Sequence, residues 1–247
     1  MSGHKESDSL EGHFQASQIA FLRQMAHEMR SPLNSVIATT DMLLGGAYGE
    51  ILPRQRIASE RIMRNGERLL RLMDNAMTFI RASANGLLLK NTQINPVDLL
   101  QHCLDQQLAA ASKTTLCTVI QRGPPSAVWG DPDYLGWIVT GLLSNALIAS
   151  DQGETQLSLQ ADSGDRWIIV LTDPGVGMTP EEVSQVGEPF FRGRAFRRLH
   201  PRGCGLTAAA IKQVIRMMGG IIRWESTPDQ GTTVTLNLPL VMPEYPG

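Results

Sequence analysis

An apolar seam with helical spacing dominates the N-terminal part of the sequence. Apolar or small side chains recur there in alternating steps of three and four residues: Ile19, Leu22, Ala26, Met29, Leu33, Val36, Thr40 and Leu43. This spacing is typical of the buried seam of a coiled coil or a helical bundle. The helix is predicted to end in a turn, because the chain continues with Gly45, Gly46, Gly49 and Pro53.

A second helical stripe follows this turn. Its apolar side chains are Ile62, Leu69, Leu72, Ala76 and Phe79. Two long helices joined by a short turn form a hairpin that covers only part of its apolar surface. A second copy of the chain would complete a four-helix bundle, so the sequence predicts a homodimer. We expect this helical hairpin to span residues 14–88.

The pattern changes near residue 90, where a polar segment at residues 91–96 predicts a linker. Beyond it, short β-like runs alternate with helical patterns. Helices are predicted at residues 97–112, 133–150 and 206–218, and strands at residues 115–121, 156–161, 167–172, 221–225 and 232–238. This order predicts an α/β sandwich over residues 95–242, with helices on one face of the sheet.

The composition argues against several classes of protein. The chain has 247 residues and a net charge of -2, which gives no reason to expect binding to nucleic acid or to an anionic membrane. It contains no run of about 18 apolar residues that could cross a membrane. Its polar N-terminus does not resemble a signal peptide, and its three cysteines form no CxxC pair. We therefore expect a cytoplasmic location and no membrane contact for this chain.

His27 is the first candidate for chemistry. It lies one position past the seam residue Ala26, so its imidazole should face the flank of the bundle. The neutral form of an imidazole is a competent nucleophile. Glu28 beside it can accept the proton from one ring nitrogen. Pro32 frees the backbone carbonyl of Glu28, one turn back, and allows the helix to bend. The alternative is an ordinary solvated histidine.

Asn145 and Asp173 are the candidates in the second half. Asn145 lies on a strongly apolar helix, where its amide oxygen could bind Mg²⁺ together with nucleotide phosphates. Asp173 follows a predicted strand directly, and its carboxylate could accept a hydrogen bond from the exocyclic amine of adenine. Gly175 and Gly177 would let the backbone turn sharply and approach the base.

Phosphate recognition is predicted further along the chain. Gly203, Gly205 and Leu206 open a helix, whose first N–H groups can bind phosphate. Thr232 lies in a second turn where the backbone would approach closely. Arg192 could bind phosphate through a bidentate guanidinium contact.

These residues stand in motifs that resemble those of sensor histidine kinases. HEMRSPLN, beginning at His27, is similar to the H-box of that family, LLSNA to the N-box, and DPGVGM to the G1 box. EPFFRG is similar to the F-box, RGCGL to the G2 box, and GTTVTLNLP to the closing strand. The resemblance covers residues 21–239. It implies a dimerisation and histidine-phosphotransfer hairpin followed by a Bergerat-fold domain that binds ATP.

The resemblance also implies roles for single residues. His27 would accept the phosphoryl group, with Glu28 as its acid/base partner. Ser31 occupies the position used for dephosphorylating a partner. Asn145 would hold Mg²⁺, Asp173 would bind adenine, and residues 178–202 would form a lid over ATP. The implied function is autophosphorylation on histidine, followed by transfer to an aspartate in a response-regulator receiver domain, in the cytoplasmic part of a sensor.

Three positions depart from the family pattern. Gly141 replaces the first asparagine of the N-box, Ile148 a common phosphate-binding lysine, and Thr207 a frequent glycine. The lid arginines could supply the lost positive charge: Arg192, Arg194, Arg197, Arg198 and Arg202. Two other interpretations stay open. One is an ATPase of the same fold, although Gly141 offers no base for hydrolysis. The other is a degenerate kinase that serves as a nucleotide-binding dimeric scaffold.

Overall fold

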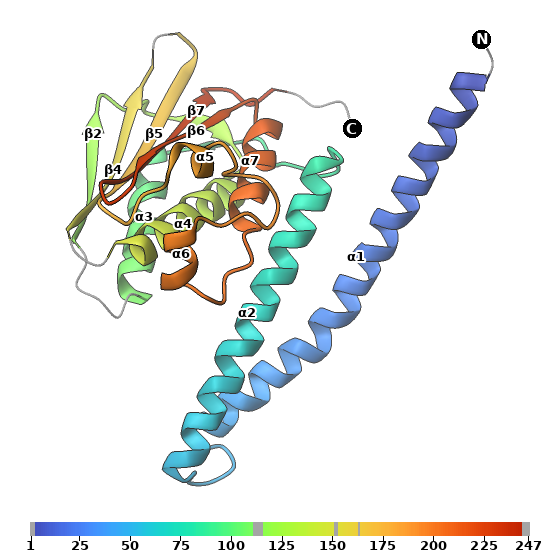
Figure 1. Cartoon of the computed structure of the whole chain (residues 1–247), viewed down its shortest axis with the longest axis vertical. Helices are drawn as coiled ribbons and strands as arrows, with labels where there is room; N and C mark the ends of the chain where they lie inside the picture. Colours follow the sequence, from blue (N-terminus) through green and yellow to red (C-terminus); the bar gives the residue numbers. More distant parts are fainter. Residues whose placement is uncertain (1–2, 111–115, 151–152, 163, 244–247) are drawn as a thin grey trace. The chain divides into compact units, whose positions relative to one another are not determined.

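The computed structural model describes residues 3–110, 116–150, 153–162 and 164–243 (Figure 1). The chain divides after Arg81 into two compact units. The first unit is helical, and the second combines helices with a sheet. No helix among the described residues has the length and apolar character needed to cross a membrane.

The first unit is the predicted hairpin of two long helices, α1 (Gly3–Leu44) and α2 (Pro53–Ser83). Gly46 and Gly49 have φ angles of +81° and +100°, which glycine adopts without strain, and they turn the chain between the helices. The helices approach closely at Gly66, where an added Cβ would lie 2.8 Å from Cγ1 of Ile37. The two helices and the turn that joins them are therefore confirmed.

The second unit begins with a short strand and a helix. Its elements are β1 (Thr92–Ile94), α3 (Pro96–Ala110), β2 (Leu116–Arg122), β3 (Val128–Gly130), α4 (Pro132–Ala149), β4 (Glu154–Ala161), β5 (Arg166–Asp173), α5 (Pro180–Val183), α6 (Arg194–Leu199), α7 (Thr207–Met217), β6 (Ile221–Thr227) and β7 (Gly231–Pro239). Asp131 caps α4, because its carboxylate accepts hydrogen bonds from the backbone N–H groups of Asp133 and Tyr134.

Five of these strands form one mixed sheet in the order β2-β4-β5-β7-β6. β2 runs parallel to β4, and the other neighbours are antiparallel. Alternate side chains of β5 are buried, at Trp167, Ile169 and Leu171. Helices α3, α4 and α7 pack on this covered face (Figure 1). The structure thus confirms the predicted α/β fold.

Some short elements were not predicted. β1 lies in the segment expected to be a linker and pairs with β3, so that Ile94 is opposite Val128 and both are buried. Two more helices, α5 and α6, lie in the segment between β5 and α7. Elements this short carry too few residues to show a period. The predicted end of the helix at Ser112 and the start of the strand at Thr115 lie outside the described residues.

Candidate functional site

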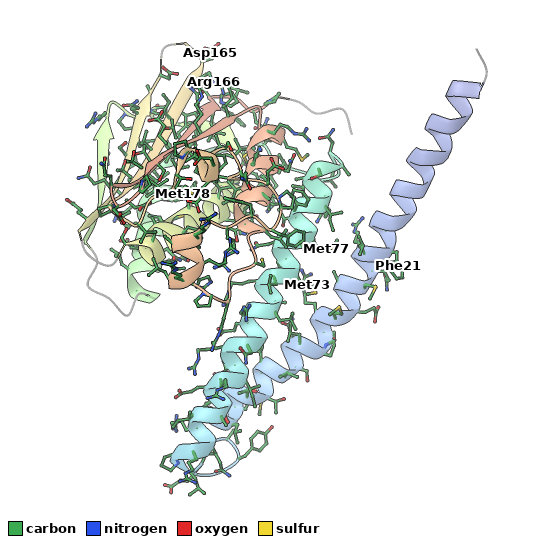
Figure 2. All side chains as sticks on the ribbon, in the orientation of Figure 1. Phe21, Met73, Met77, Asp165, Arg166 and Met178 are labelled. Carbon is green, nitrogen blue, oxygen red and sulfur yellow. The ribbon has the colours of Figure 1, made fainter. Side chains whose placement is uncertain are left out.

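A cavity of about 200 Å³ opens in the second unit, beside α4 and α7 and the end of β5. Seven of the predicted site residues line it: Asn145, Asp173, Gly177, Arg192, Gly203, Gly205 and Thr232. Gly175 and Leu206 are adjacent to these residues in sequence without lining the cavity. Met178, also in the wall, follows β5, and Figure 2 shows it well away from Arg166, the first residue of that strand.

Asp173 ends β5 and is 5% exposed. One carboxylate oxygen accepts a hydrogen bond of 2.9 Å from the backbone N–H of Gly175, and Thr232 on β7 pairs with Asp173 across the sheet. Burial raises the pKa of Asp173 to about 6, although the backbone hydrogen bonds from Gly175 and Thr232 oppose this shift. The side chain is therefore an ionised acceptor at neutral pH, in the position predicted for reading an amine.

The glycines after Asp173 approach other parts of the protein backbone. A Cβ on Gly175 would lie 2.7 Å from the carbonyl oxygen of Ala149. A Cβ on Gly177, which has φ of +59°, would overlap the carbonyl oxygen of Thr227. The sequence predicted a sharp turn and an approach to a base. The turn is found, and the close approach seen in the structure is to the end of α4 and to the β6–β7 turn.

Asn145 is half-buried on α4 and lines the cavity. No group of three or more His, Cys, Asp or Glu side chains in the described part of the chain could hold a metal ion. Mg²⁺ commonly takes only one or two protein oxygens and completes its shell with phosphates and water. The amide oxygen of Asn145 fits an Mg²⁺ ion that arrives with a nucleotide.

Glu182 is a structural residue that the sequence reasoning missed. Its carboxylate accepts a hydrogen bond of 3.1 Å from the backbone N–H of Thr179 and one of 2.8 Å from that of Arg194. It therefore ties the start of α5 to the start of α6. The signal was present in the sequence, because Thr179 and Glu182 have the spacing of a capping box.

Arg192 has an arrangement that the sequence did not predict. Its guanidinium donates hydrogen bonds to the backbone carbonyls of Gly203, at 2.8 Å, of Pro201, at 3.4 Å, and of His200. It also lies 5.9 Å from the ring centroid of Phe196. Of the other described lid arginines, Arg194, Arg197, Arg198 and Arg202 are exposed and none is in the cavity wall. Direct phosphate binding by Arg192 stays a prediction.

Two of the three departures from the family pattern meet in space. An added Cβ on Gly141 would lie 3.2 Å from Cγ2 of Thr207 and 3.3 Å from Cδ1 of Ile211. Thr207 lines the cavity at the start of α7. Ile148 is half-buried and is not part of the wall. Compared with the family pattern, position 207 has threonine in place of glycine and position 141 has glycine in place of asparagine. The side chain of Thr207 therefore lies in space that a side chain at position 141 would need.

The remaining predicted residues lie on α1, in the other unit. Ala26 is buried and His27 is exposed, as the seam predicts. Glu28 accepts a hydrogen bond of 2.7 Å from the side chain of Gln24. Ser31 is exposed, and α1 continues through Pro32. The cavity residues are thus gathered in one unit, and His27, Glu28 and Ser31 lie together on a helix of the other.

Known proteins match both units. Residues 130–242 match the histidine kinase-, DNA gyrase B- and HSP90-like ATPases, and residues 17–85 match the His Kinase A (phospho-acceptor) domain. The sensor protein GacS of Pseudomonas syringae pv. syringae is 31% identical over 226 residues, which make up 89% of this chain. The circadian input-output histidine kinase CikA of Synechococcus elongatus is 32% identical over 228 residues, or 91% of this chain. The chain belongs to the histidine kinase family.

This histidine kinase chain spans only part of each curated relative: 25% of GacS and 30% of CikA. Among solved structures, it is similar to full-length ShkA in complex with AMPPNP, with a TM-score of 0.76 and 22% identity. That match covers 92% of the kinase chain and 47% of ShkA. The mycobacterial sensor histidine kinase MprB matches 62% of the chain and 100% of its own, with a TM-score of 0.55 and 28% identity.

Proposed function

We propose that this kinase core transfers the γ-phosphoryl group of ATP to His27, and that the group then passes to an aspartate of a response-regulator receiver domain. One observation carries the proposal. A cavity in one unit gathers an acidic side chain, an amide and a glycine-rich helix start, while an exposed histidine lies on a helix of the other unit. We place the activity in the cytoplasm, where ATP is available.

The nucleotide would be held at both ends by the cavity. The ionised carboxylate of Asp173 accepts a hydrogen bond from the adenine amine, with Gly175, Gly177 and Thr232 shaping the backbone around it. The backbone N–H groups from Cys204 to Leu206 and those at the start of α7 face the phosphates, and Gly203 lines the cavity beside them. Asn145 holds Mg²⁺, which would neutralise phosphate charge when bound.

His27 supplies the nucleophile. One ring nitrogen attacks the γ-phosphorus, the bond from phosphorus to the bridging oxygen breaks, and ADP leaves with the electron pair. The proton on the other ring nitrogen passes to Glu28. In the structure the carboxylate of Glu28 accepts a hydrogen bond from Gln24. A hydrogen bond between Glu28 and His27 would form in the reactive complex, as catalytic hydrogen bonds often do. Ser31, one turn further on, would orient a water molecule for dephosphorylation.

A homodimer of the hairpin is part of this proposal, with residues 14–88 as the dimerisation and phosphotransfer domain and residues 95–242 as the catalytic domain. The α1 seam splits into two sets at seven-residue spacing. Ala26 and Thr40 are buried and Leu33 is half-buried. Leu22, Met29 and Val36 are 41%, 47% and 47% exposed. On α2, Ile62 and Leu69 are 50% and 46% exposed. A second copy would cover this apolar surface.

The test is incubation of the purified chain with Mg²⁺ and ATP labelled on the γ-phosphate. We expect protein-bound label that is lost in acid and survives base, and that is absent from His27→Gln. Asp173→Asn should also take up no label, because it should not bind ATP. Wild-type protein that binds ATP and stays unlabelled would establish the alternative, a degenerate kinase that acts as a dimeric scaffold.

Transfer to a partner needs a separate experiment. Labelled kinase, freed of ATP, is mixed with a panel of purified receiver domains. Label should leave the kinase and appear on a receiver domain, and it should fail to do so when the acceptor aspartate of that receiver is changed to asparagine. Label that stays on His27 with every receiver would contradict this half of the proposal.

A further inference from the structure

The segment from Phe190 to Gly205 is a loop closed at its base. The backbone N–H of Phe190 donates a hydrogen bond of 3.1 Å to the carbonyl of Gly205. Phe190 has a φ of +65°, an uncommon value for a bulky residue. The guanidinium of Arg192 lies inside this loop, where it binds the carbonyls of His200, Pro201 and Gly203. One side chain thus binds three backbone carbonyls on the far side of the loop.

The glycines of this loop are matched to Arg192. A Cβ on Gly203 would lie 3.2 Å from both Cζ and Nη2 of Arg192. A Cβ on Gly205 would lie 3.0 Å from Cγ of Arg192, and would overlap the carbonyl oxygen of Phe191. A Cβ on Gly203 would also lie 2.7 Å from Cδ2 of His200, so the absence of a side chain at the two positions leaves room for Arg192 and for the neighbouring atoms of the loop.

The hydrogen bonds also set the direction of a backbone donor. The C=O and N–H of one planar trans peptide point to opposite sides. The carbonyl of Gly203 points at Arg192, so the N–H of Cys204, in the same peptide, points away from the guanidinium. Gly203, Cys204 and Gly205 all line the cavity. Arg192 thereby fixes the orientation of an N–H group in the segment expected to face phosphate.

We propose that Arg192 is a positioning residue, which shapes residues 200–205 through their carbonyls so that the backbone N–H groups of Cys204 and Gly205 are presented to the nucleotide phosphates. It acts through the loop rather than by placing its own charge on phosphate. That the ligand is a nucleotide rests on the proposed function. That Arg192 acts through the loop rests on its hydrogen bonds to the loop carbonyls.

Arg192→Lys separates the two roles, since lysine keeps the charge and loses the planar fork that reaches several carbonyls at once. Arg223→Lys on the exposed edge strand β6 is the matched control. The first readout is hydrogen exchange of residues 200–205 in nucleotide-free protein. We expect Arg192→Lys to speed this exchange about tenfold, as the loss of a hydrogen bond to a charged group predicts. The control should exchange like wild type.

The second readout is affinity for ADP and ATP. A loop that is wrongly shaped should weaken both about equally, with a raised KM for ATP and a smaller change in kcat. Unchanged exchange in nucleotide-free Arg192→Lys, with ATP affinity retained because the charge is retained, would overturn the proposal. Loss of ATP affinity alone, with normal exchange, would assign Arg192 to phosphate directly and would overturn it as well.

Gly203→Ala is a second variant in case Arg192→Lys does not fold. Its methyl group would lie 2.7 Å from Cδ2 of His200 and 3.2 Å from Cζ of Arg192, so it would crowd both side chains and leave the arginine charge in place. The same faster exchange is therefore expected. Exchange does not depend on catalysis. Wild-type protein that fails to label His27 would therefore refute the proposed function, while the exchange result would still decide the role of Arg192.

Discussion

Asp173 combines two opposing influences on one carboxyl group. Burial at the end of β5 favours the neutral form, and backbone N–H groups favour the ionised form. The balance raises the pKa to about 6 from the ordinary value of 3.8. The ionised carboxylate is the stronger acceptor for the exocyclic amine of adenine, because a hydrogen bond to a charged oxygen is about twice as strong as one to the carbonyl oxygen of a neutral carboxyl group. The affinity of the site for the base should therefore depend on pH.

Adenosine affinity should fall as the pH drops through about 6, where Asp173 takes up a proton and becomes the weaker acceptor. Adenosine is the ligand to use, because the terminal phosphate of ATP titrates in the same range. Calorimetric titrations between about pH 8 and about pH 5 would measure this. Equal affinity at both ends of the range would show that the ionised carboxylate does not read the base.

Asp173→Asn should abolish measurable ATP binding without lowering stability at neutral pH. The pKa of Asp173 is higher in the folded protein than when unfolded, so this group's contribution to stability is fully present below about pH 4 and is lost as the pH rises through about 6. Asparagine does not ionise, so the variant does not lose this contribution to stability as the pH rises. The free energy of unfolding should vary less with pH in the variant. Near-normal ATP affinity would remove Asp173 from the site.

The packing of α4 against α7 shows how the departures from the family pattern fit together. Glycine in the middle of a helix costs about 1 kcal/mol relative to alanine, so Gly141 needs a structural reason. The contact with Thr207 and Ile211 supplies one, because any Cβ there would crowd α7. Since Thr207 lines the cavity, this contact also sets the position of the cavity wall.

Gly141→Asn should push the start of α7 outwards and destabilise the fold by about 1–3 kcal/mol, the usual cost of overpacking. ATP affinity should fall with it. The double variant Gly141→Asn, Thr207→Gly should recover a large part of both losses, because removing the threonine side chain makes room for the asparagine. Thermal unfolding and ATP titration of the single and double variants would test this. Additive losses in the double variant would show that the two positions are independent.

The long elements could be predicted from the sequence, and the short ones could not. Periodicity over many residues identified α1 and α2, and longer helical, apolar or alternating runs predicted α3, α4, α7 and the strands of the main sheet. β1 and β3 have three residues each and depend on pairing with each other. The fit of Gly177 against Thr227 arises from a contact between distant parts of the chain, and the fit of Gly203 against Arg192 arises from the closure of one loop. No local sequence pattern contains that information. The sequence could therefore single out these glycines, but it could not predict the contacts that they make.

At the scale of the whole molecule, the hairpin leaves an apolar surface that one chain does not cover. Phe21, drawn on α1 in Figure 2, is 63% exposed, and Met25 is 43% exposed. Monomeric proteins rarely expose a continuous apolar patch of this kind. The seven-residue spacing of the exposed seam residues indicates a partner helix that follows the same period.

Val36→Glu combined with Ile62→Glu should convert a dimer into a monomer, because each chain would place two charges in the apolar interface of the bundle. Sedimentation equilibrium would measure the molecular mass. Ser35→Glu, at a neighbouring exposed polar position, is the control and should stay dimeric. A wild-type chain that is monomeric at concentrations well above those of the assay would contradict the four-helix bundle.

The most direct test of the account is the location of the phosphoryl group after incubation with ATP and Mg²⁺. Peptide mass spectrometry under neutral or basic conditions, which preserve phosphohistidine, can assign it to one residue. We predict a single modified side chain, His27, and no modification in His27→Gln or Asp173→Asn. Phosphoryl groups on another residue, or ADP formed with no modified protein, would contradict the assignment of this chain as a kinase that phosphorylates its own helical hairpin.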